Sequence, residues 1–79
     1  MTKKENDIKQ EIGNFLQAKG WTKDAGSNYK NELNGSVYRM KFNTNVLRYE
    51  VKSEAGWVRL RSGYWKDISI TEKGIRGLT

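Results

Sequence analysis

The residues best suited to chemistry in this 79-residue chain are basic and aromatic side chains that alternate along residues 37–66. This segment holds seven lysines and arginines against two glutamates, which gives a net charge of +5 out of +6 for the whole chain. Arginine and lysine bind phosphate oxygens, and an indole ring offers a flat surface on which a base stacks. The candidate nucleic-acid-binding residues are Arg39, Lys41, Arg48, Lys52, Trp57, Arg59, Arg61, Trp65 and Lys66. Together they predict binding to single-stranded DNA or RNA, with low sequence specificity and a preference for single strands over duplex.

Other chemistry is poorly supported. The chain has no histidine and no cysteine, so it lacks the usual general base, the thiol nucleophile and the soft metal ligands. Its glycines are isolated and form no phosphate-binding loop. Asp7 and Glu11 share one helix face with lysines nearby, which is ordinary surface patterning. We therefore predict a protein that is not an enzyme and that uses no metal and no cofactor.

Length and composition indicate a single small domain over residues 1–79. The first ten residues are polar and charged, without the apolar run of a secretory signal. No segment approaches the ~18 consecutive apolar residues of a membrane span. We expect a cytoplasmic protein that makes no contact with membranes, and we leave a homodimer open.

Residues 4–19 have the periodicity of an amphipathic helix. Its apolar stripe consists of Ile8, Ile12, Phe15 and Leu16. Thr2 and Glu5 have the spacing of a capping box. Gly13 weakens the helix by up to ~1 kcal/mol relative to alanine, a cost that close packing against a sheet would offset.

Beyond residue 28 the period changes from 3.6 to 2, which predicts antiparallel strands. Asn34-Gly35 is a strong type I′ hairpin signal. Pairing Phe42 with Leu47 gives a register in which apolar side chains share one face and the basic ones the other. The apolar face is expected to hold Tyr38, Met40, Phe42, Leu47, Tyr49, Val51, Val58 and Leu60. The predicted fold is α+β: an N-terminal helix on a curved antiparallel meander of four to five strands over residues 29–70, then a short C-terminal helical turn.

The position of Trp65 depends on the turn at residues 62–63. A two-residue turn pairs Leu60 with Trp65 and sends the indole into the core. A three-residue loop pairs Leu60 with Tyr64, exposes Trp65 and places both isoleucines of residues 68–70 inside. We favour the second register because it buries the isoleucines.

Two further positions have alternative interpretations. Trp57 follows Gly56 and either joins the binding surface or folds over the sheet edge as part of the core. Arg39 faces Glu50 across the strands and is interpreted as an exposed ion pair of small energetic value. The arginines without an obvious acidic partner are Arg48, Arg59 and Arg61. We expect these three to lie on one open face and to carry most of the binding.

Three segments of the chain resemble small transcription-coactivator-like single-stranded DNA-binding proteins of the positive-cofactor type. They are Tyr29-Lys30-Asn31-Glu32-Leu33-Asn34, Arg48-Tyr49-Glu50-Val51-Lys52 and Lys66-Asp67-Ile68-Ser69-Ile70-Thr71-Glu72-Lys73. The resemblance implies a curved antiparallel sheet whose basic and aromatic strand residues hold the single strand, and a dimer formed through a C-terminal helix. This chain differs in its long N-terminal helix and in Asp67, where the family has glycine.

A second class of function fits the same surface. Arginine, tryptophan and tyrosine are the residues enriched at protein–protein hot spots. The alternative is therefore a protein-interaction module, a regulator or inhibitor of the kind carried by phages and other mobile elements. Salt distinguishes the two, because nucleic-acid binding weakens steeply with salt and a hydrophobic interface does not.

Overall fold

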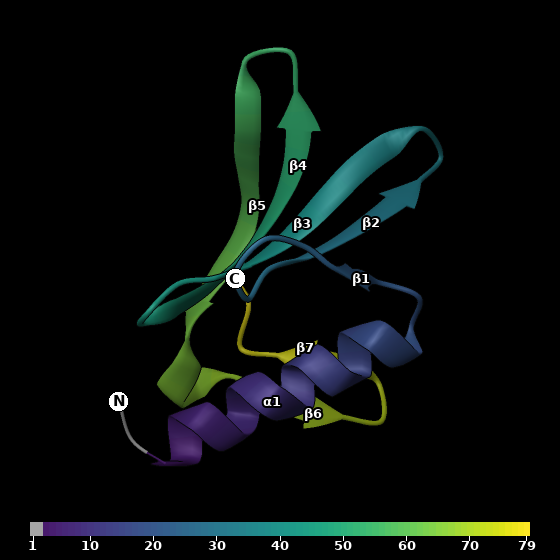
Figure 1. Ribbon diagram of the computed structural model, residues 1–79. Coiled ribbons are helices and arrows are strands. Elements are labelled where there is room, and N and C mark those ends of the chain that lie inside the picture. The colour runs from purple at the N-terminus through teal and green to yellow at the C-terminus, as the bar shows by residue number, and fades with distance from the viewer. Residues whose placement is uncertain (1–2) are drawn as a thin grey trace.

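Residues 3–79 are described in the computed structural model, where they form a helix, a five-stranded antiparallel sheet, a 3₁₀ turn and a separate small hairpin (Figure 1). The elements are α1 (Lys3–Ala18), β1 (Thr22–Lys23), β2 (Tyr29–Leu33), β3 (Ser36–Phe42), β4 (Val46–Ser53), β5 (Gly56–Tyr64), the 3₁₀ helix Trp65–Asp67, β6 (Ser69–Thr71) and β7 (Gly74–Arg76). The predicted α+β class, with a helix on an antiparallel meander, is confirmed.

The large sheet is a meander in which β1 to β5 lie in chain order. In Figure 1 the β2–β3 and β4–β5 hairpins diverge like the arms of a V, and α1 runs across their base beside β6 and β7. The helix therefore covers only the lower part of one sheet face, and the outer halves of both hairpins extend beyond it.

Helix α1 contributes its apolar stripe to the core as predicted. Ile12 and Leu16 are buried, and Ile8 and Phe15 pack against the same cluster. The buried core side chains are Ile12, Leu16, Tyr29, Met40, Leu47, Trp65 and Ile68. The capping box expected at the start of the helix involves Thr2, which lies outside the described residues.

Helix α1 packs closely against Tyr29 of β2 at Gly13. A Cβ atom at this position would lie 2.6 Å from Oη and 3.2 Å from Cζ of Tyr29. The tyrosine is itself buried in the core. The helix-weakening glycine is thus explained by packing, since any larger side chain would push Tyr29 away.

The predicted register of the central hairpins is confirmed. Phe42 pairs with Leu47, and Arg39 pairs with Glu50. Asn34 and Gly35 have φ values of 53° and 83°, the left-handed values that a type I′ turn requires at both positions. This turn fixes β2 against β3, so Tyr29 joins the apolar face.

The pairing of β4 with β5 differs from the prediction because β5 contains a β-bulge. Glu50 pairs with Arg59 and Tyr49 pairs with Arg61, so Leu60 has no partner in β4. The predicted burial of Val58 and Leu60 is wrong, since their exposed fractions are 47% and 46%. Leu60 is the extra residue of the bulge, and Val58 lies toward the tip of the hairpin, beyond the part of the sheet that α1 covers.

The favoured exposure of Trp65 is also wrong. Strand β5 continues through residues 62–63 without a turn, and Trp65 begins the 3₁₀ helix with only 1% of its surface exposed. Its Nε1–H donates to the Asn43 carbonyl at 2.8 Å, and its ring packs edge-on against Phe42 at 5.0 Å. Ile68 is buried even so, and Ile70 packs against the core.

The C-terminal segment forms a second hairpin in place of the expected helical turn. Strands β6 and β7 pair with each other, and the one helical turn in this region comes earlier, at Trp65–Asp67. Ser62 and Thr79 then exchange two backbone hydrogen bonds of 3.1 and 2.9 Å. The segment can approach β5 this closely only because residue 63 is glycine, as a Cβ there would collide with the Gly77 carbonyl.

We predict that Gly13→Ala destabilises the fold by about 1 kcal/mol. Overpacking against Tyr29 costs roughly 1–3 kcal/mol, which exceeds the helix-propensity gain of up to ~1 kcal/mol. Asn14→Ala is the matched control, because Asn14 is exposed and its replacement should raise the free energy of unfolding by about 0.5 kcal/mol. Urea unfolding of both variants, and of Gly13→Ala in a Tyr29→Phe background, measures the effect. Equal stabilisation by the two alanines would contradict the close contact.

Candidate nucleic-acid interface

Most of the predicted binding residues lie on the sheet face opposite α1. The strand register places Arg39 beside Glu50, Lys41 beside Arg48, and Lys52 beside Trp57. Their chain neighbours Met40 and Leu47 point the other way, into the core. We define the basic face as Lys30, Arg39, Lys41, Arg48, Glu50, Lys52, Trp57, Arg59 and Tyr64. The basic face is thus a continuous surface across β2, β3, β4 and β5.

Glu50 is the structural centre of the basic face. It is only 2% exposed. Arg39 donates from Nε and Nη2 to its Oε1 at 2.9 and 2.6 Å, and Arg48 Nη2 lies 3.2 Å from Oε2. The expectation of an exposed ion pair is therefore wrong, because the carboxylate is buried and each of its oxygens is paired with a different arginine. Hydrogen bonds of this charged type contribute about 1.5–3 kcal/mol.

Trp57 lies on the basic face and is not part of the core cluster. Its ring packs on Arg39, with the guanidinium carbon 4.1 Å from the ring centroid. Arg39 is therefore fixed by an ion pair to Glu50 and by a cation–π contact to the indole. Of the two interpretations of Trp57, the surface position is the one observed.

Three basic residues of this face are free of acidic partners among residues 3–79: Lys41, Lys52 and Arg59. Arg59 and Lys52 are exposed, and Lys41 is half-buried. Lys30, by contrast, forms an ion pair with Asp24, with 3.5 Å between Nζ and Oδ2. The exposed Glu32 lies on the same side of the sheet as Lys30 and Arg39. Glu50 neutralises only one of the two arginines that contact it, so the face still has more positive than negative charges.

Arg61 and Trp65 do not belong to the basic face. The bulge at Leu60 pairs Arg61 with Tyr49, so Arg61 lies on the opposite face from Arg59. The expectation that Arg48, Arg59 and Arg61 share one face is therefore wrong for Arg61. Trp65 is core, and the exposed Lys66 lies beside the face, with Nζ 5.8 Å from the Tyr64 ring centroid.

Tyr64 is a residue of this face that sequence reasoning missed. It pairs with Val46 and is 58% exposed. The alternation of β5 read without a bulge turns Tyr64 inward. The extra residue in β5 turns Tyr64 outward, and the regular alternation of residues 57–61 gives no signal for it.

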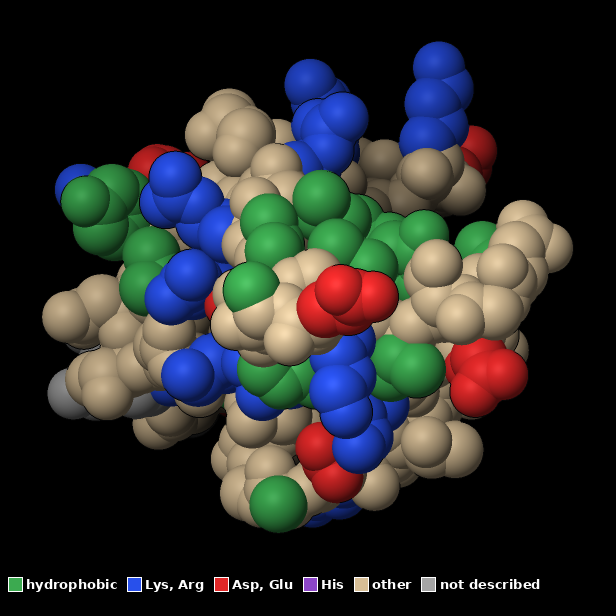
Figure 2. All heavy atoms as spheres, turned by 90° about the horizontal axis from the view of Figure 1, so that it is seen from above, with side chains coloured by type: hydrophobic (Ala, Val, Ile, Leu, Met, Phe, Trp, Pro, Cys, Tyr) green, Lys and Arg blue, Asp and Glu red, His purple; other side chains and the backbone are tan. Residues whose placement is uncertain are grey.

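The outer part of the helix-side face forms a second, partly exposed surface, which we call the tyrosine face. It consists of Leu33, Tyr38, Tyr49, Val51, Val58 and Arg61. The rings of Tyr38 and Tyr49 stack at 5.6 Å with an interplanar angle of 15°. From above, Figure 2 shows hydrophobic side chains gathered near the centre of the molecule, with lysine and arginine side chains to the left of, above and below them.

The ionisation of Tyr49 reports on this surface. Burial raises the pKa of its phenol above the ordinary value of 10.0, the neighbouring Tyr38 raises it further, and the charge of Arg61 lowers it. The opposing effect of Arg61 on this pKa follows from the bulge, which brings the guanidinium to the tyrosine side of β5.

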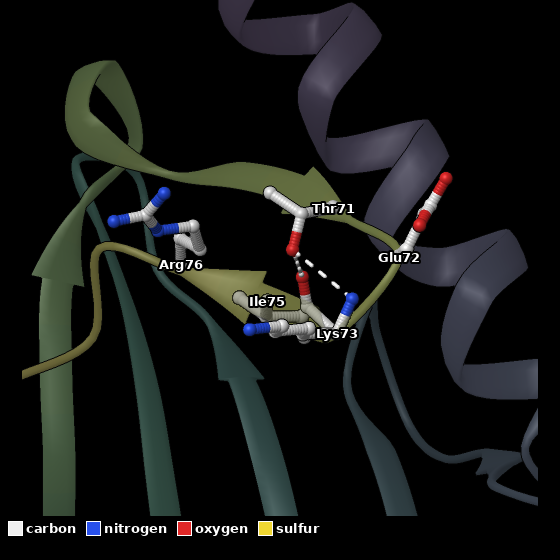
Figure 3. Close-up of a pocket in the computed structure, with 6 residues that line it drawn as sticks. Thr71, Glu72, Lys73, Ile75 and Arg76 are labelled. Carbon is white, nitrogen blue, oxygen red and sulfur yellow. Dashed lines mark hydrogen bonds between the residues drawn. The ribbon is translucent and has the colours of Figure 1, made fainter.

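A hollow with a volume of about 590 Å³ lies at the β6–β7 hairpin (Figure 3). Its lining comes from residues 71–76 alone. The Thr71 hydroxyl accepts from Lys73 N and donates to the Gly74 carbonyl, which holds the turn. Glu72 points away from the turn interior in this view. This hollow is lined by one hairpin alone, and no residue of the basic face contributes to it.

No protein-family model, curated protein or solved structure matches this chain. The resemblance to positive-cofactor-type proteins therefore stays a prediction. Within residues 3–79, no helix has the length and apolar character needed to cross a membrane.

We predict that Arg61→Gln raises the pKa of Tyr49 further, because it removes the positive charge that favours the phenolate. Arg59→Gln removes the same charge two residues away, on the other face, and should leave this pKa unchanged. NMR of ¹³C-labelled tyrosine across the alkaline range, with Tyr49→Phe to assign the signal, measures both. A shift with Arg59→Gln instead would mean that β5 has no bulge.

Proposed function

We propose that this protein binds nucleic acid, DNA or RNA, with low sequence specificity and a preference for single strands, through its basic face. The observation that carries the proposal is a set of three cations without acidic partners among residues 3–79, Lys41, Lys52 and Arg59. They lie on an open sheet beside the exposed ring of Tyr64 and the half-buried ring of Trp57. Such a surface attracts the phosphate backbone and offers rings to unstacked bases. The binding involves no catalysis and no cofactor, and we place it in the cytoplasm.

The preference for single strands is supported by the shape of the elements. Duplex readers usually place a helix or a two-stranded ribbon in a groove. Here α1 is packed against the sheet, and its outer side mixes lysines with acids. Aromatic rings on a sheet bind bases only when these are unstacked, as in single strands. The sequence resemblance to single-stranded DNA-binding proteins points in the same direction.

The runner-up is a protein-interaction module. The specific observation in its favour is the tyrosine face, where Leu33 and Val58 are exposed beside stacked tyrosines. Exposed apolar patches with aromatic residues are typical of protein contacts. Binding through that face would respond weakly to salt and would not require Arg59.

Arg59→Gln should weaken binding to all single-stranded sequences about equally. It should also reduce the slope of log K against log salt by about 0.7, the value for one phosphate contact on a single strand. Arg61→Gln is the matched control, because it removes the same charge from the same strand on the other face. Fluorescence anisotropy of labelled single-stranded and duplex oligonucleotides over a salt series measures both. Equal losses would mean that net charge alone drives binding, and no binding at low salt would leave the interaction module ahead.

Glu50→Gln should have opposite effects on stability and binding. Loss of the charged hydrogen bonds to Arg39 and Arg48 should lower the free energy of unfolding by about 1.5–3 kcal/mol. The arginines then carry an uncompensated charge, so the affinity for single strands should rise and the salt slope should steepen by up to about 0.7. Urea unfolding and anisotropy on the folded variant measure the two effects.

Glu54→Gln provides the control, because Glu54 is exposed in the β4–β5 turn and loses the same charge. Its stability should stay within about 0.5 kcal/mol of the wild type. If Glu50→Gln weakened oligonucleotide binding while the domain stayed folded, the positive charge of the basic face would not be the source of affinity.

A further inference from the structure

A hollow of about 610 Å³ opens at the lower end of the basic face, where β4 and β5 meet the C-terminal segment. This volume lies within the range of about 300–1,000 Å³ that is typical of small-molecule sites. Its lining residues are Asn43, Val46, Arg48, Arg59, Ser62, Gly63, Tyr64, Asp67, Gly77 and Thr79. Unlike the hollow at β6–β7, it is built from two neighbouring strands together with the C-terminal segment, which is distant from them in the chain.

Two arginines of the hollow have unused capacity to donate hydrogen bonds. Arg59 has no acidic partner among the described residues, and Arg48 is paired only through Nη2, with Glu50. The Nε atom of Arg48 is buried and has no hydrogen-bond partner. A buried donor without an acceptor is destabilising, so an anion that draws this guanidinium into the hollow would relieve the deficit. Arginine suits phosphate because its planar group donates two parallel hydrogen bonds.

The remaining lining favours a nucleoside over a second phosphate. The exposed ring of Tyr64 offers a stacking surface at the edge of the hollow. Asp67 also lines the hollow, and its carboxylate repels a second anion but accepts hydrogen bonds from base N–H or sugar hydroxyl groups. The Ser62 and Asn43 side chains can donate or accept. One anionic group together with a planar polar ring therefore fits this set better than a polyphosphate.

We propose that this hollow is a nucleotide subsite in which Arg48 and Arg59 hold one phosphate group and Tyr64 stacks the attached base. The proposal rests on the proposed function, since the bound nucleotide would be one unit of the single strand. Lys41, which neighbours Arg48 in the sheet, then contacts an adjacent phosphate.

The test is titration of the ¹⁵N-labelled protein with uridine 5′-monophosphate, uridine and inorganic phosphate, followed by NMR. The monophosphate should shift the amide signals of Ser62, Gly63 and Tyr64 and bind at least fivefold more tightly than uridine or phosphate alone. Tyr64→Ser should reduce its affinity to that of phosphate and leave phosphate binding unchanged. Arg59→Gln should weaken both ligands at least fivefold.

Lys52→Gln is the control, because Lys52 lies on the basic face but outside the hollow. It should weaken oligonucleotide binding and leave affinity for the monophosphate unchanged. Two results would show that the subsite is wrong while the proposed function stands. In the first, oligonucleotides bind but the monophosphate leaves these amide signals unshifted. In the second, oligonucleotides bind but Lys52→Gln and Arg59→Gln weaken monophosphate binding equally. Binding of the monophosphate here without oligonucleotide binding would support the subsite and overturn the proposed function.

Discussion

The extra residue in β5 decides which side chains of this strand lie on each of the two sheet faces. Strand β4 pairs with β5 at Glu50 and Arg59 and again at Tyr49 and Arg61, and Leu60 between them has no partner. Side chains alternate between faces with a period of two, so one inserted residue reverses the face of every later position. Arg61 thereby joins the tyrosines, and Tyr64 joins the basic face. The arginines of a single strand are divided between two surfaces of different character.

The cluster around Glu50 gives the basic face its rigidity. A carboxylate that is 2% exposed would be very costly without partners, yet here two guanidinium groups pair with its two oxygens. Trp57 packs on Arg39 and keeps that guanidinium in place. The charges without an acidic partner among residues 3–79 therefore lie around this cluster, and within it Arg48 is paired with Glu50 only through Nη2. Glu50 organises the surface and limits its positive charge at the same time.

The sequence predicted two kinds of feature: elements with local signals, and strand pairs whose facing side chains match in character. The apolar stripe of α1 and the Asn34-Gly35 turn are local, and the pairing of Phe42 with Leu47 matches side chains of like character all along β3 and β4. Most of the basic face follows from that register.

The remaining positions are decided by contacts between distant residues. Trp65 is buried because its Nε1–H donates to the Asn43 carbonyl and its ring packs against Phe42. Nothing in residues 62–70 indicates those partners. The bulge likewise cannot be predicted from residues 57–61, because apolar and basic side chains alternate regularly there whether or not a residue is inserted.

The bulge also bears on how β5 behaves as the edge of the sheet. An edge strand presents unpaired N–H and C=O groups that can pair with the same edge of another molecule, the first step of β-aggregation. Thr79 occupies this edge at Ser62, but the stretch from Gly56 to Arg61 has no such cover in the described structure. There the irregular backbone at Leu60 and the flanking charges of Arg59 and Arg61 disfavour a straight intermolecular ladder. The same insertion that sorts the arginines between two faces therefore helps to keep copies of the chain from assembling edge to edge.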